Sequence, residues 1–226
     1  MNNNKKVSFI MPVFNDEENI HQSINSMQSQ TYKDIEILVL DDCSTDNTYD
    51  ICKEISLKDT RIKLYKNDIN LGLTRSLNKL INYSTGFYIA RHDSDDKSVN
   101  YRIEAQINFL ENYKLDACYS RAYVQESKKV LPNLSYYLPL KFVIKYKNPF
   151  IHGTLLIKKD VIESVGGYDE FFYFSQDYKL INDLLNNGFK VKIDKKAMYY
   201  LNMKDNISTK YKDIQKIYAD ISKKQV

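Results

Sequence analysis

Short apolar runs alternate with helical patterns over the first 90 residues, and this alternation constrains the fold more than any other feature. It is typical of parallel β-strands joined by crossover helices. The runs expected to form strands are Val7–Met11, Ile35–Leu40, Ile62–Tyr65 and Phe87–Ala90. They are almost continuously apolar, apart from Ser8 and Glu36, which indicates strands buried on both faces. We therefore predict an α/β fold with a Rossmann-like, mostly parallel sheet flanked by helices.

The second half of the chain is less regular. A helical pattern from Ile103 to Leu110 precedes an expected strand at Ala117–Val124. The segment Gln125–Asn148 mixes lysines, prolines and aromatic residues, and we expect a long functional loop or short helices there. The later elements expected are a strand at Thr154–Ile157, helices at Lys159–Val165 and Tyr178–Asn187, and a strand at Ala197–Leu201.

Composition favours one globular domain in a reducing compartment. The 226 residues are 43% hydrophobic and 27% charged, which is enough apolar material for a core. No run approaches the ~20 apolar residues of a membrane-spanning helix, and the amino terminus has no signal-peptide pattern. We expect a cytoplasmic protein. Cys43, Cys52 and Cys118 lack the paired spacing of a zinc site and are expected to be reduced thiols.

The basic charge is concentrated at the carboxyl end. The net charge is +4, and residues 178–226 carry eleven Lys against five Asp. Apolar residues recur at helical spacing from Lys210 to Lys224, between lysines. Two interpretations stay open for this basic amphipathic helix: it packs on the body of the protein, or it contacts the inner face of the cell membrane peripherally. We expect no nucleic-acid partner.

Polar residues follow each of the first four expected strands. They are Pro12–Asn15, Asp41–Asp42, Asn70 and Asp93–Asp96. Because ligands of open parallel sheets bind beyond the carboxyl ends of the strands, we expect one shared site. Three carboxylates in four residues repel one another unless a cation neutralises them, and oxygen ligands suit Mg²⁺, Mn²⁺ or Ca²⁺. We predict a divalent cation that binds phosphates; a solvated acidic turn capped by Ser94 is the alternative.

Other phosphate-binding and metal-binding motifs are disfavoured. A calcium loop starting at Asp93 would place Lys97 at a ligand position and Ser98 where the turn needs Gly. Pro12–Asn15 stands where a dinucleotide-binding unit or a nucleotidyltransferase has its glycine-rich loop. A metal, and not a cradle of backbone amides, is therefore expected to hold the phosphates.

Taken together, these motifs resemble the inverting glycosyltransferases of family 2, which transfer sugars from nucleotide-diphospho-sugars and have the GT-A fold. The similarity covers most of the chain. The segments that carry it are Val7–Asn15, Leu40–Thr48, Asn70–Leu73, Ala90–Asp96, Gly166–Glu170 and Ser175–Tyr178. In this order and spacing they form a specific set.

The resemblance implies roles for individual residues. Those implied to bind the nucleotide-sugar are Pro12, Val13, Phe14, Asn15, Glu17, Asp42, Asn70, Arg75, Asp93, Ser94, Asp96 and His152. Within this set, the Pro12–Phe14 segment would lie along the base and ribose, and Asp42 would accept a hydrogen bond from uracil. Asp95 is the implied ligand of Mn²⁺ or Mg²⁺, with Asp96 as a second candidate.

Asp177 is the implied general base. Inversion needs one carboxylate to take the acceptor proton while the metal stabilises the departing diphosphate. The structural alternative is that Asp177 only caps the helix expected from Tyr178. Four positions depart from the family pattern: Gln176 replaces Glu, Leu77 replaces Arg, Met203 replaces His, and Cys43 replaces Gly.

The expected function is metal-dependent, inverting hexosyl or N-acetylhexosaminyl transfer from a nucleotide-sugar, preferably a UDP-sugar, to a glycan or lipid-linked acceptor in bacterial surface polysaccharide synthesis. Residues 1–98 would bind the donor, residues 99–209 would bind the acceptor and catalyse transfer, and residues 210–226 would form the basic helix. The departures from the family pattern leave one alternative, a nucleotide-sugar-binding accessory protein with impaired catalysis.

Overall fold

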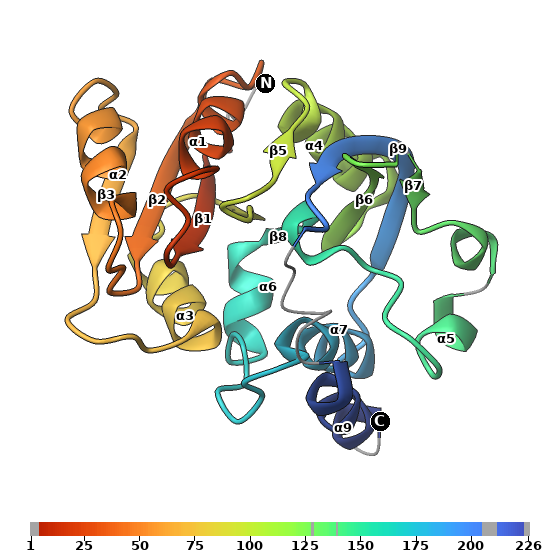
Figure 1. The fold of residues 1–226 in the computed structure, drawn as a ribbon. Helices are drawn as coiled ribbons and strands as arrows, with labels where there is room; N and C mark the ends of the chain where they lie inside the picture. Colours follow the sequence, from red (N-terminus) through yellow and green to blue (C-terminus); the bar gives the residue numbers. More distant parts are fainter. Residues whose placement is uncertain (1–4, 128, 139, 205–211, 224–226) are drawn as a thin grey trace.

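A single sheet runs through the protein (Figure 1). The structure is a computed structural model that describes residues 5–127, 129–138, 140–204 and 212–223. Its nine strands have the order β3-β2-β1-β4-β8-β6-β9-β5, and β7 pairs with β6. The strands are β1 Val7–Val13, β2 Ile35–Asp41, β3 Ile62–Lys66, β4 Tyr88–Arg91, β5 Lys97–Ser98, β6 Ala117–Val124, β7 Val130–Leu131, β8 Leu156–Lys158 and β9 Val191–Leu201.

The amino-terminal half of the sheet is parallel, as the alternation predicted. β1 lies between β2 and β4, β3 lies outside β2, and all three ladders are parallel. The carboxyl-terminal half is mixed, because β8 runs antiparallel to both β4 and β6 while β9 runs parallel to β6. The α/β class is confirmed, and the carboxyl ends of β1, β2 and β4 open toward one edge.

Helices cover both faces of the sheet. The helices are α1 Ile20–Gln28, α2 Thr48–Ser56, α3 Leu73–Tyr83, α4 Arg102–Tyr113, α5 Leu140–Val143, α6 Lys159–Ser164, α7 Gln176–Asn186 and α9 Lys212–Lys223, with 3₁₀ turns η1 Leu134–Tyr137 and η2 His152–Thr154. One core cluster contains buried residues of α1, α2 and α4, and the other contains those of α3, α6 and α7. Phe9 faces the first cluster and Ile10 the second, so β1 is buried on both sides.

The irregular segment Gln125–Asn148, expected to be a long loop or short helices, contains short helical elements and one short strand. β7, η1 and α5 all lie within it. Two later strands differ from their expected bounds. Thr154 belongs to η2, where its hydroxyl donates to Ser120 O at 3.2 Å, and β9 begins at Val191 instead of Ala197. Lysines interrupt the apolar pattern at the start of β9, so its pairing with β6 is invisible to periodicity.

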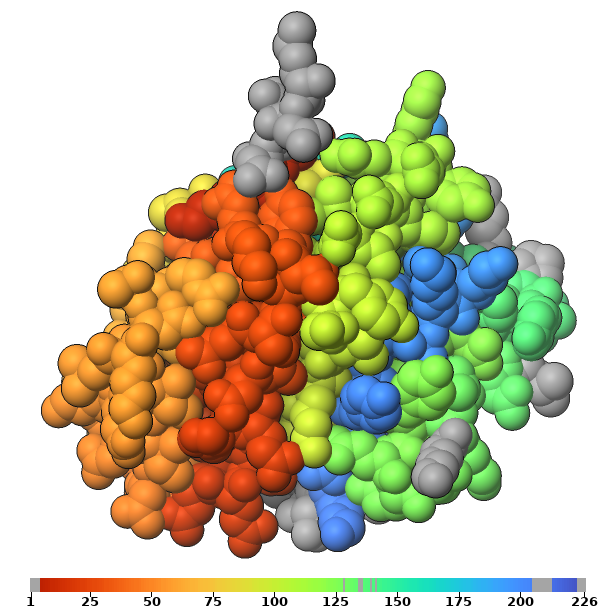
Figure 2. All heavy atoms as spheres, turned by 90° about the horizontal axis from the view of Figure 1, so that it is seen from above, coloured from red at the N-terminus to blue at the C-terminus, as the bar shows by residue number. Residues whose placement is uncertain are grey.

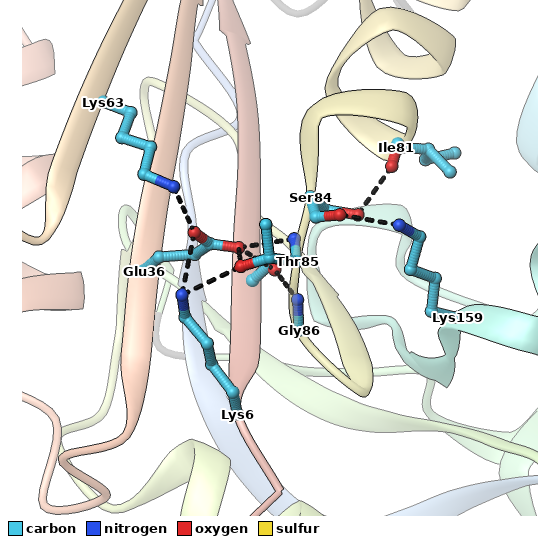
Figure 3. Close-up of polar contacts among 9 residues, drawn as sticks. Lys6, Glu36, Lys63, Ile81, Ser84, Thr85, Gly86 and Lys159 are labelled. Carbon is cyan, nitrogen blue, oxygen red and sulfur yellow. Dashed lines mark hydrogen bonds and ion pairs between the residues drawn. The ribbon is translucent and has the colours of Figure 1, made fainter.

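The two polar exceptions in the strands meet at the amino-terminal end of the parallel sheet (Figure 3). Ser8 Oγ donates to Glu36 Oε1 at 2.6 Å, and Lys63 Nζ donates to Glu36 Oε2 at 2.8 Å. The backbone N–H of Thr85 and its hydroxyl also donate to Oε1, at 2.7 and 2.9 Å. The side chain of Glu36 is 3% exposed, and hydrogen bonds satisfy both of its oxygens. We call this group the Glu36 cluster.

The carboxyl-terminal helix packs on the body, which confirms one of its two interpretations. α9 lies beside α7 (Figure 1). Asn182 Nδ2 donates to Ser222 Oγ at 2.7 Å, and Tyr218 contacts a group of phenylalanines that includes Phe172. Ile217 remains 60% exposed. The expected helix residues 210, 211 and 224, and the amino terminus 1–4, lie outside the described residues.

Two further expectations concern the whole chain. The cysteines are free thiols: Cys43 is half-buried, and Cys52 and Cys118 are buried. Among the described residues, no helix has both the length and the apolar character that crossing a bilayer requires.

Candidate active site

The motif at the end of β1 divides into buried and exposed parts. Pro12 and Val13 belong to β1 and are buried. Phe14, the first residue beyond the strand, is 47% exposed. Of these three residues, Phe14 therefore offers a ring face to a ligand, while Pro12 and Val13 shape the strand beneath it.

The loops that follow β1 and β2 are joined by Asn15 and Glu17. Asn15 has a positive φ of 50°, and its Oδ1 accepts a 2.8 Å hydrogen bond from the backbone N–H of Thr45. Glu17 Oε2 accepts bonds from the backbone N–H and the side-chain Nδ2 of Asn47, at 2.9 and 2.7 Å. Both residues predicted to contact the nucleotide thus hold the two strand-end loops in a fixed relation.

Asp42, the predicted uracil contact, organises the loop that leads into α3. It is 4% exposed. Its Oδ1 accepts hydrogen bonds from Asn67 Nδ2 and the Leu71 N–H, at 2.7 and 2.9 Å, and its Oδ2 accepts one from the Gly72 N–H at 2.8 Å. Asn70 Oδ1 accepts from the same Gly72 N–H at 3.1 Å. The two predicted polar residues therefore meet at the amino terminus of α3.

The same end of α3 contacts the loop before α7. Gly72 has φ 82°, and a Cβ added to it would lie 2.7 Å from Cε2 of Tyr173. Arg75 forms an ion pair with Glu170 at 3.2 Å, with both side chains more than half exposed. Arg75, predicted to contact a phosphate, thus joins α3 to the loop that precedes Asp177.

The acidic turn after β4 is held by residues distant in sequence. Arg91 Nη2 forms an ion pair with Asp93 Oδ1, and the guanidinium is 1% exposed. The Asp93 N–H donates to Tyr199 Oη at 3.0 Å. A Cβ added to Gly153 would lie 2.6 Å from Asp93 Oδ2, so only glycine permits this approach. β4, η2 and β9 together fix the position of Asp93.

Asp95 and Asp96 have different surroundings. Asp96 is 2% exposed, and its Oδ1 accepts a 2.7 Å hydrogen bond from the Asn202 N–H just after β9. Asp95 is half-buried, as are Asp93 and Ser94. Burial, then the charges of Asp93 and Asp16, raises the pKa of Asp95 to about 7. Burial, then the charges of Asp93 and Asp95, raises the pKa of Asp96 well above its ordinary value.

These carboxylates fit a cation that is coordinated partly by the protein and partly by substrate phosphates. Within the part of the chain that the structure describes, no three Asp, Glu, His or Cys side chains converge to cage a metal. Mg²⁺ typically takes only one or two protein carboxylates and completes its coordination with water and substrate phosphates. The half-buried carboxylate of Asp95, next to the negative charges of Asp93 and Asp16, has that chemistry.

Asp177 lies in the first turn of α7 and not at its N-cap, which is Ser175. Its Oδ2 accepts a 2.6 Å hydrogen bond from Asn148 Nδ2. Burial raises the pKa of Asp177 to about 6, and the charge of Asp93 adds to the increase, although hydrogen bonds from Tyr178 and Asn148 oppose it. The acidic turn and Asp177 therefore share one electrostatic environment, across 84 residues of sequence.

His152 belongs to the wall between these two groups. Its Nε2 lies 2.8 Å from the hydroxyl of Tyr168. Burial, with the nearby positive charge of Arg91, lowers its pKa well below the ordinary value, so the imidazole is neutral. A neutral histidine exchanges hydrogen bonds here without adding charge to the site.

Three residues that the sequence did not single out also shape the site. They are Arg91, Asn148 and Tyr199. An arginine at the end of an apolar strand is a signal that could have identified Arg91, because a buried charge needs a partner nearby. Nothing local marks Asn148 or Tyr199, which reach the site from an irregular loop and from β9.

Two surface hollows lie away from the acidic turn. One, of about 620 Å³, is lined by α4 and the start of β9, which border each other on the face shown in Figure 2. Another, of about 480 Å³, lies around Asn78, the Gly166–Gly167 turn and Glu170. The site described above is therefore identified by its chemistry and not by its volume.

Residues 8–166 match the sequence profile of the family described as Glycosyl transferase family 2. The chain is 35% identical over 175 residues to the putative glycosyltransferase EpsE of Bacillus subtilis, covering 74% of this chain and 62% of that protein. It is 33% identical over 189 residues to WfaP of Escherichia coli, a UDP-Glc:alpha-D-GlcNAc-diphosphoundecaprenol beta-1,3-glucosyltransferase, covering 82% of this chain and 72% of WfaP.

Among solved structures, the mannosyltransferase PcManGT of Pyrobaculum calidifontis, in complex with GDP-Man and Mn²⁺, superposes with a TM-score of 0.76. The match covers 97% of this chain and 63% of PcManGT, at 17% sequence identity. The GT-A fold expected from the motifs is thereby confirmed. The chain spans less than two thirds of the length of EpsE and of PcManGT.

Proposed function

The chain belongs to glycosyl transferase family 2, and on that premise we propose that it transfers a sugar, with inversion, from a UDP-sugar to a hydroxyl of a glycan or lipid-linked acceptor. One observation carries the proposal: the short segment from Asn148 to Gly153 contacts Asp177 at one end, through the 2.6 Å bond from Asn148, and Asp93 at the other, where a Cβ on Gly153 would lie 2.6 Å from Oδ2. A leaving diphosphate and an attacking hydroxyl need such a juxtaposition of a cation site and a base.

Asp95 is proposed as the protein ligand of Mn²⁺ or Mg²⁺. Asp96 is the weaker candidate because its carboxylate already accepts the Asn202 N–H and is buried. When bound, the cation would neutralise charge on the departing diphosphate. Asp93, held by Arg91 and Tyr199, is proposed to orient toward the ribose or the phosphates, with Ser94 beside it.

Asp177 is proposed as the general base. As the acceptor oxygen attacks the anomeric carbon, its proton passes to the Asp177 carboxylate, and the bond from that carbon to the diphosphate oxygen breaks. A pKa of about 6 suits this role, because a base works best when its pKa lies near the operating pH while it remains ionised. Neutral His152 would help to shape the sugar site without competing for the proton.

The donor would lie over the amino-terminal strand ends. The exposed ring of Phe14 is proposed to stack on the base, above Pro12 and Val13, with Asn15 and Glu17 holding the neighbouring loops. Asp42 and Asn70 shape the loop beside α3, where Asp42 is proposed to reach uracil. The preference for UDP is supported by the donor in the name of WfaP.

The acceptor would meet the carboxyl-terminal half, residues 99–209, chiefly through Gln125–Phe150. WfaP acts on a diphosphoundecaprenol-linked sugar, which supports a lipid-linked acceptor of surface polysaccharide synthesis at the inner face of the membrane. The exposed Ile214 and Ile217 of α9, among basic residues, support peripheral membrane contact there.

The test is sugar transfer by the purified chain with UDP-glucose or UDP-GlcNAc, Mn²⁺ and a synthetic GlcNAc-diphospho-lipid, measured as UDP release and product mass. Asp177→Asn is expected to reduce kcat by ~10² to 10⁴-fold, the usual contribution of a positioned base. Asp95→Ala, which removes the proposed metal ligand, should abolish the sugar transfer that Mn²⁺ supports. The matched control is Asp160→Asn, an exposed acid in the first turn of α6, which should keep full activity.

The same assay separates transfer from the accessory role suggested by Gln176, Leu77 and Met203. Calorimetry that detects UDP-sugar binding without transfer to any acceptor would support the accessory protein. Full activity of both Asp177→Asn and Asp95→Ala would show that the proposed residues are wrong.

A further inference from the structure

The segment from α5 to η2 is anchored on the first turn of α7. Val143, Ile144 and Phe150 are less than 9% exposed, and the Phe150 ring packs on Tyr119 with centroids 4.4 Å apart. The hydroxyl of Tyr178 donates to the Ile144 carbonyl. This contact lies one residue from Asp177, so the segment and the proposed base are parts of one packed unit.

Asn148 connects this segment directly to the carboxylate of Asp177. Its Oδ1 accepts a 3.0 Å hydrogen bond from the Phe150 N–H, and its Nδ2 donates to Asp177 Oδ2 at 2.6 Å. The Phe150 bond determines the orientation of the amide, because the oxygen must face that N–H. The amide nitrogen is consequently directed at Asp177.

We propose that Asn148 is a positioning residue that holds Asp177 Oδ2 and leaves Oδ1 to receive the acceptor proton. The inference rests on the proposed function of Asp177. A carboxylate with one oxygen restrained has fewer orientations to lose on reaching the transition state, which is how positioned groups accelerate transfer. In the reaction, the acceptor O–H bond breaks, its proton binds Oδ1, and the diphosphate leaves with the electron pair of the broken glycosyl bond.

The surroundings of Asp177 make this donor consequential. The negative charge of Asp93 acts on the carboxylate, Tyr119 and Tyr168 lie near it, and the Tyr178 N–H donates to it. Asn148 donates a side-chain hydrogen bond to Asp177 Oδ2 and carries no charge itself. This bond lowers the pKa of Asp177 and so opposes the increase caused by burial. Removing it should shift the base toward its protonated form.

The decisive variant is Asn148→Asp, because it keeps an oxygen for the Phe150 N–H and replaces only the donor to Asp177. We expect kcat with UDP-glucose and the GlcNAc-diphospho-lipid to fall by roughly 10 to 100-fold, part of the contribution of a positioned base, with KM for UDP-glucose unchanged. The acidic limb of the kcat profile should move to higher pH, because a second carboxylate raises the pKa of the first.

The matched control is Asn187→Asp at the other end of α7, where the exposed Asn187 donates to the Asp183 carbonyl at 2.9 Å. It adds the same charge, but beyond the far end of α7, and should leave kcat within about twofold, since an exposed charge at that distance is screened. Wild-type kcat and pH profile in Asn148→Asp, with Asp177→Asn inactive, would overturn the positioning role alone. An active Asp177→Asn would instead overturn the proposed base.

A readout independent of turnover is the titration of ¹³C-labelled aspartate carboxyls by NMR, with Asp177 assigned by the signal missing in Asp177→Asn. In Asn148→Ala, the pKa of Asp177 should rise because a lowering hydrogen bond is lost. An unchanged titration in a folded Asn148→Ala would overturn the inference even if Asn148→Asp did not fold.

Discussion

Carboxylates lie at both ends of the parallel strands: Glu36 at the amino-terminal end, and the acidic turn, near Asp177, at the carboxyl end. The two groups differ in the hydrogen-bond donors and charges that surround them. At the amino-terminal end, burial raises the pKa of Glu36, but hydrogen bonds from Lys63, Ser8 and Thr85 outweigh it and bring the pKa below its ordinary value (Figure 3). At the carboxyl end, burial and mutual repulsion raise the pKa of Asp95 to about 7 and that of Asp177 to about 6.

The difference shows that a buried carboxylate can either stabilise the fold or take part in binding and catalysis, depending on the donors and charges around it. The Glu36 cluster gives its carboxylate donors on both oxygens, so ionisation and folding favour each other. The acidic turn brings together carboxylates that folding alone does not satisfy, and a fold tolerates such a group where a ligand supplies the missing charge. The first group stabilises the sheet, and the second keeps a place for a cation and a substrate.

The largest expected effect on the free energy of unfolding comes from removing the Glu36 carboxylate. Glu36→Ala leaves the Thr85 N–H and the Ser8 hydroxyl without their acceptor, and we expect the free energy of unfolding to fall by roughly 2 to 4 kcal/mol. Urea unfolding measures this loss. Glu54→Ala, which removes an exposed ion pair with Lys58, should leave the free energy of unfolding nearly unchanged, because solvent screens that pair. Equal losses in both variants would contradict the distinction.

The pH dependence of the same cluster should be the next largest effect. Because folding lowers the pKa of Glu36, its contribution is complete above the ordinary value of 4.5 and is lost as pH falls toward the folded value. The stability difference between wild type and Glu36→Gln should therefore be constant from pH 7 to 5 and shrink at lower pH. Urea titrations at pH 7, 5, 4 and 3 test it, and a difference that grew on acidification would have the wrong sign.

The smallest expected effect has the opposite direction and concerns the acidic turn. Asp95→Asn removes a charge that burial and Asp93 disfavour, so the protein without metal should gain stability, by about 1 kcal/mol or less at pH 8. Since the pKa of Asp95 is raised, the gain should be present at pH 8 and decline as pH falls toward 4, where wild type is protonated. Thermal unfolding in chelator at both pH values measures it; destabilisation at pH 8 would break the comparison.

Periodicity predicted the parallel half of the sheet well. The expected strand Ile35–Leu40 is β2 Ile35–Asp41, and in the mixed half the expected strand Ala117–Val124 is β6 without change. It failed at β9, where lysines occupy the exposed positions of the first half, and at η2, where a buried Thr154 looked like part of a strand. The antiparallel ladders joining β4, β8 and β6 involve pairings that no local pattern encodes.

The same division applies to the candidate site. The order of polar motifs after successive strands predicted the acidic turn, and the resemblance to family 2 implied Asp177; the roles assigned to both stay predictions. The contacts that distinguish them did not follow from the motifs: Asn202 reaches Asp96 from beyond β9, and Asn148 reaches Asp177 from an irregular loop. Asn15 and Glu17 likewise prove to join two loops.

Spacing along a few turns of chain was enough to predict the strands of the parallel half, the helices that join them and the acidic side chains that follow them. Which carboxylate has hydrogen-bond donors on both oxygens, and which is crowded by other charges, followed only from the folded arrangement. The reason is physical: the free energy of a buried charge depends on donors and charges within a few ångströms, and for Glu36, Asp96 and Asp177 those groups come from segments remote in the sequence.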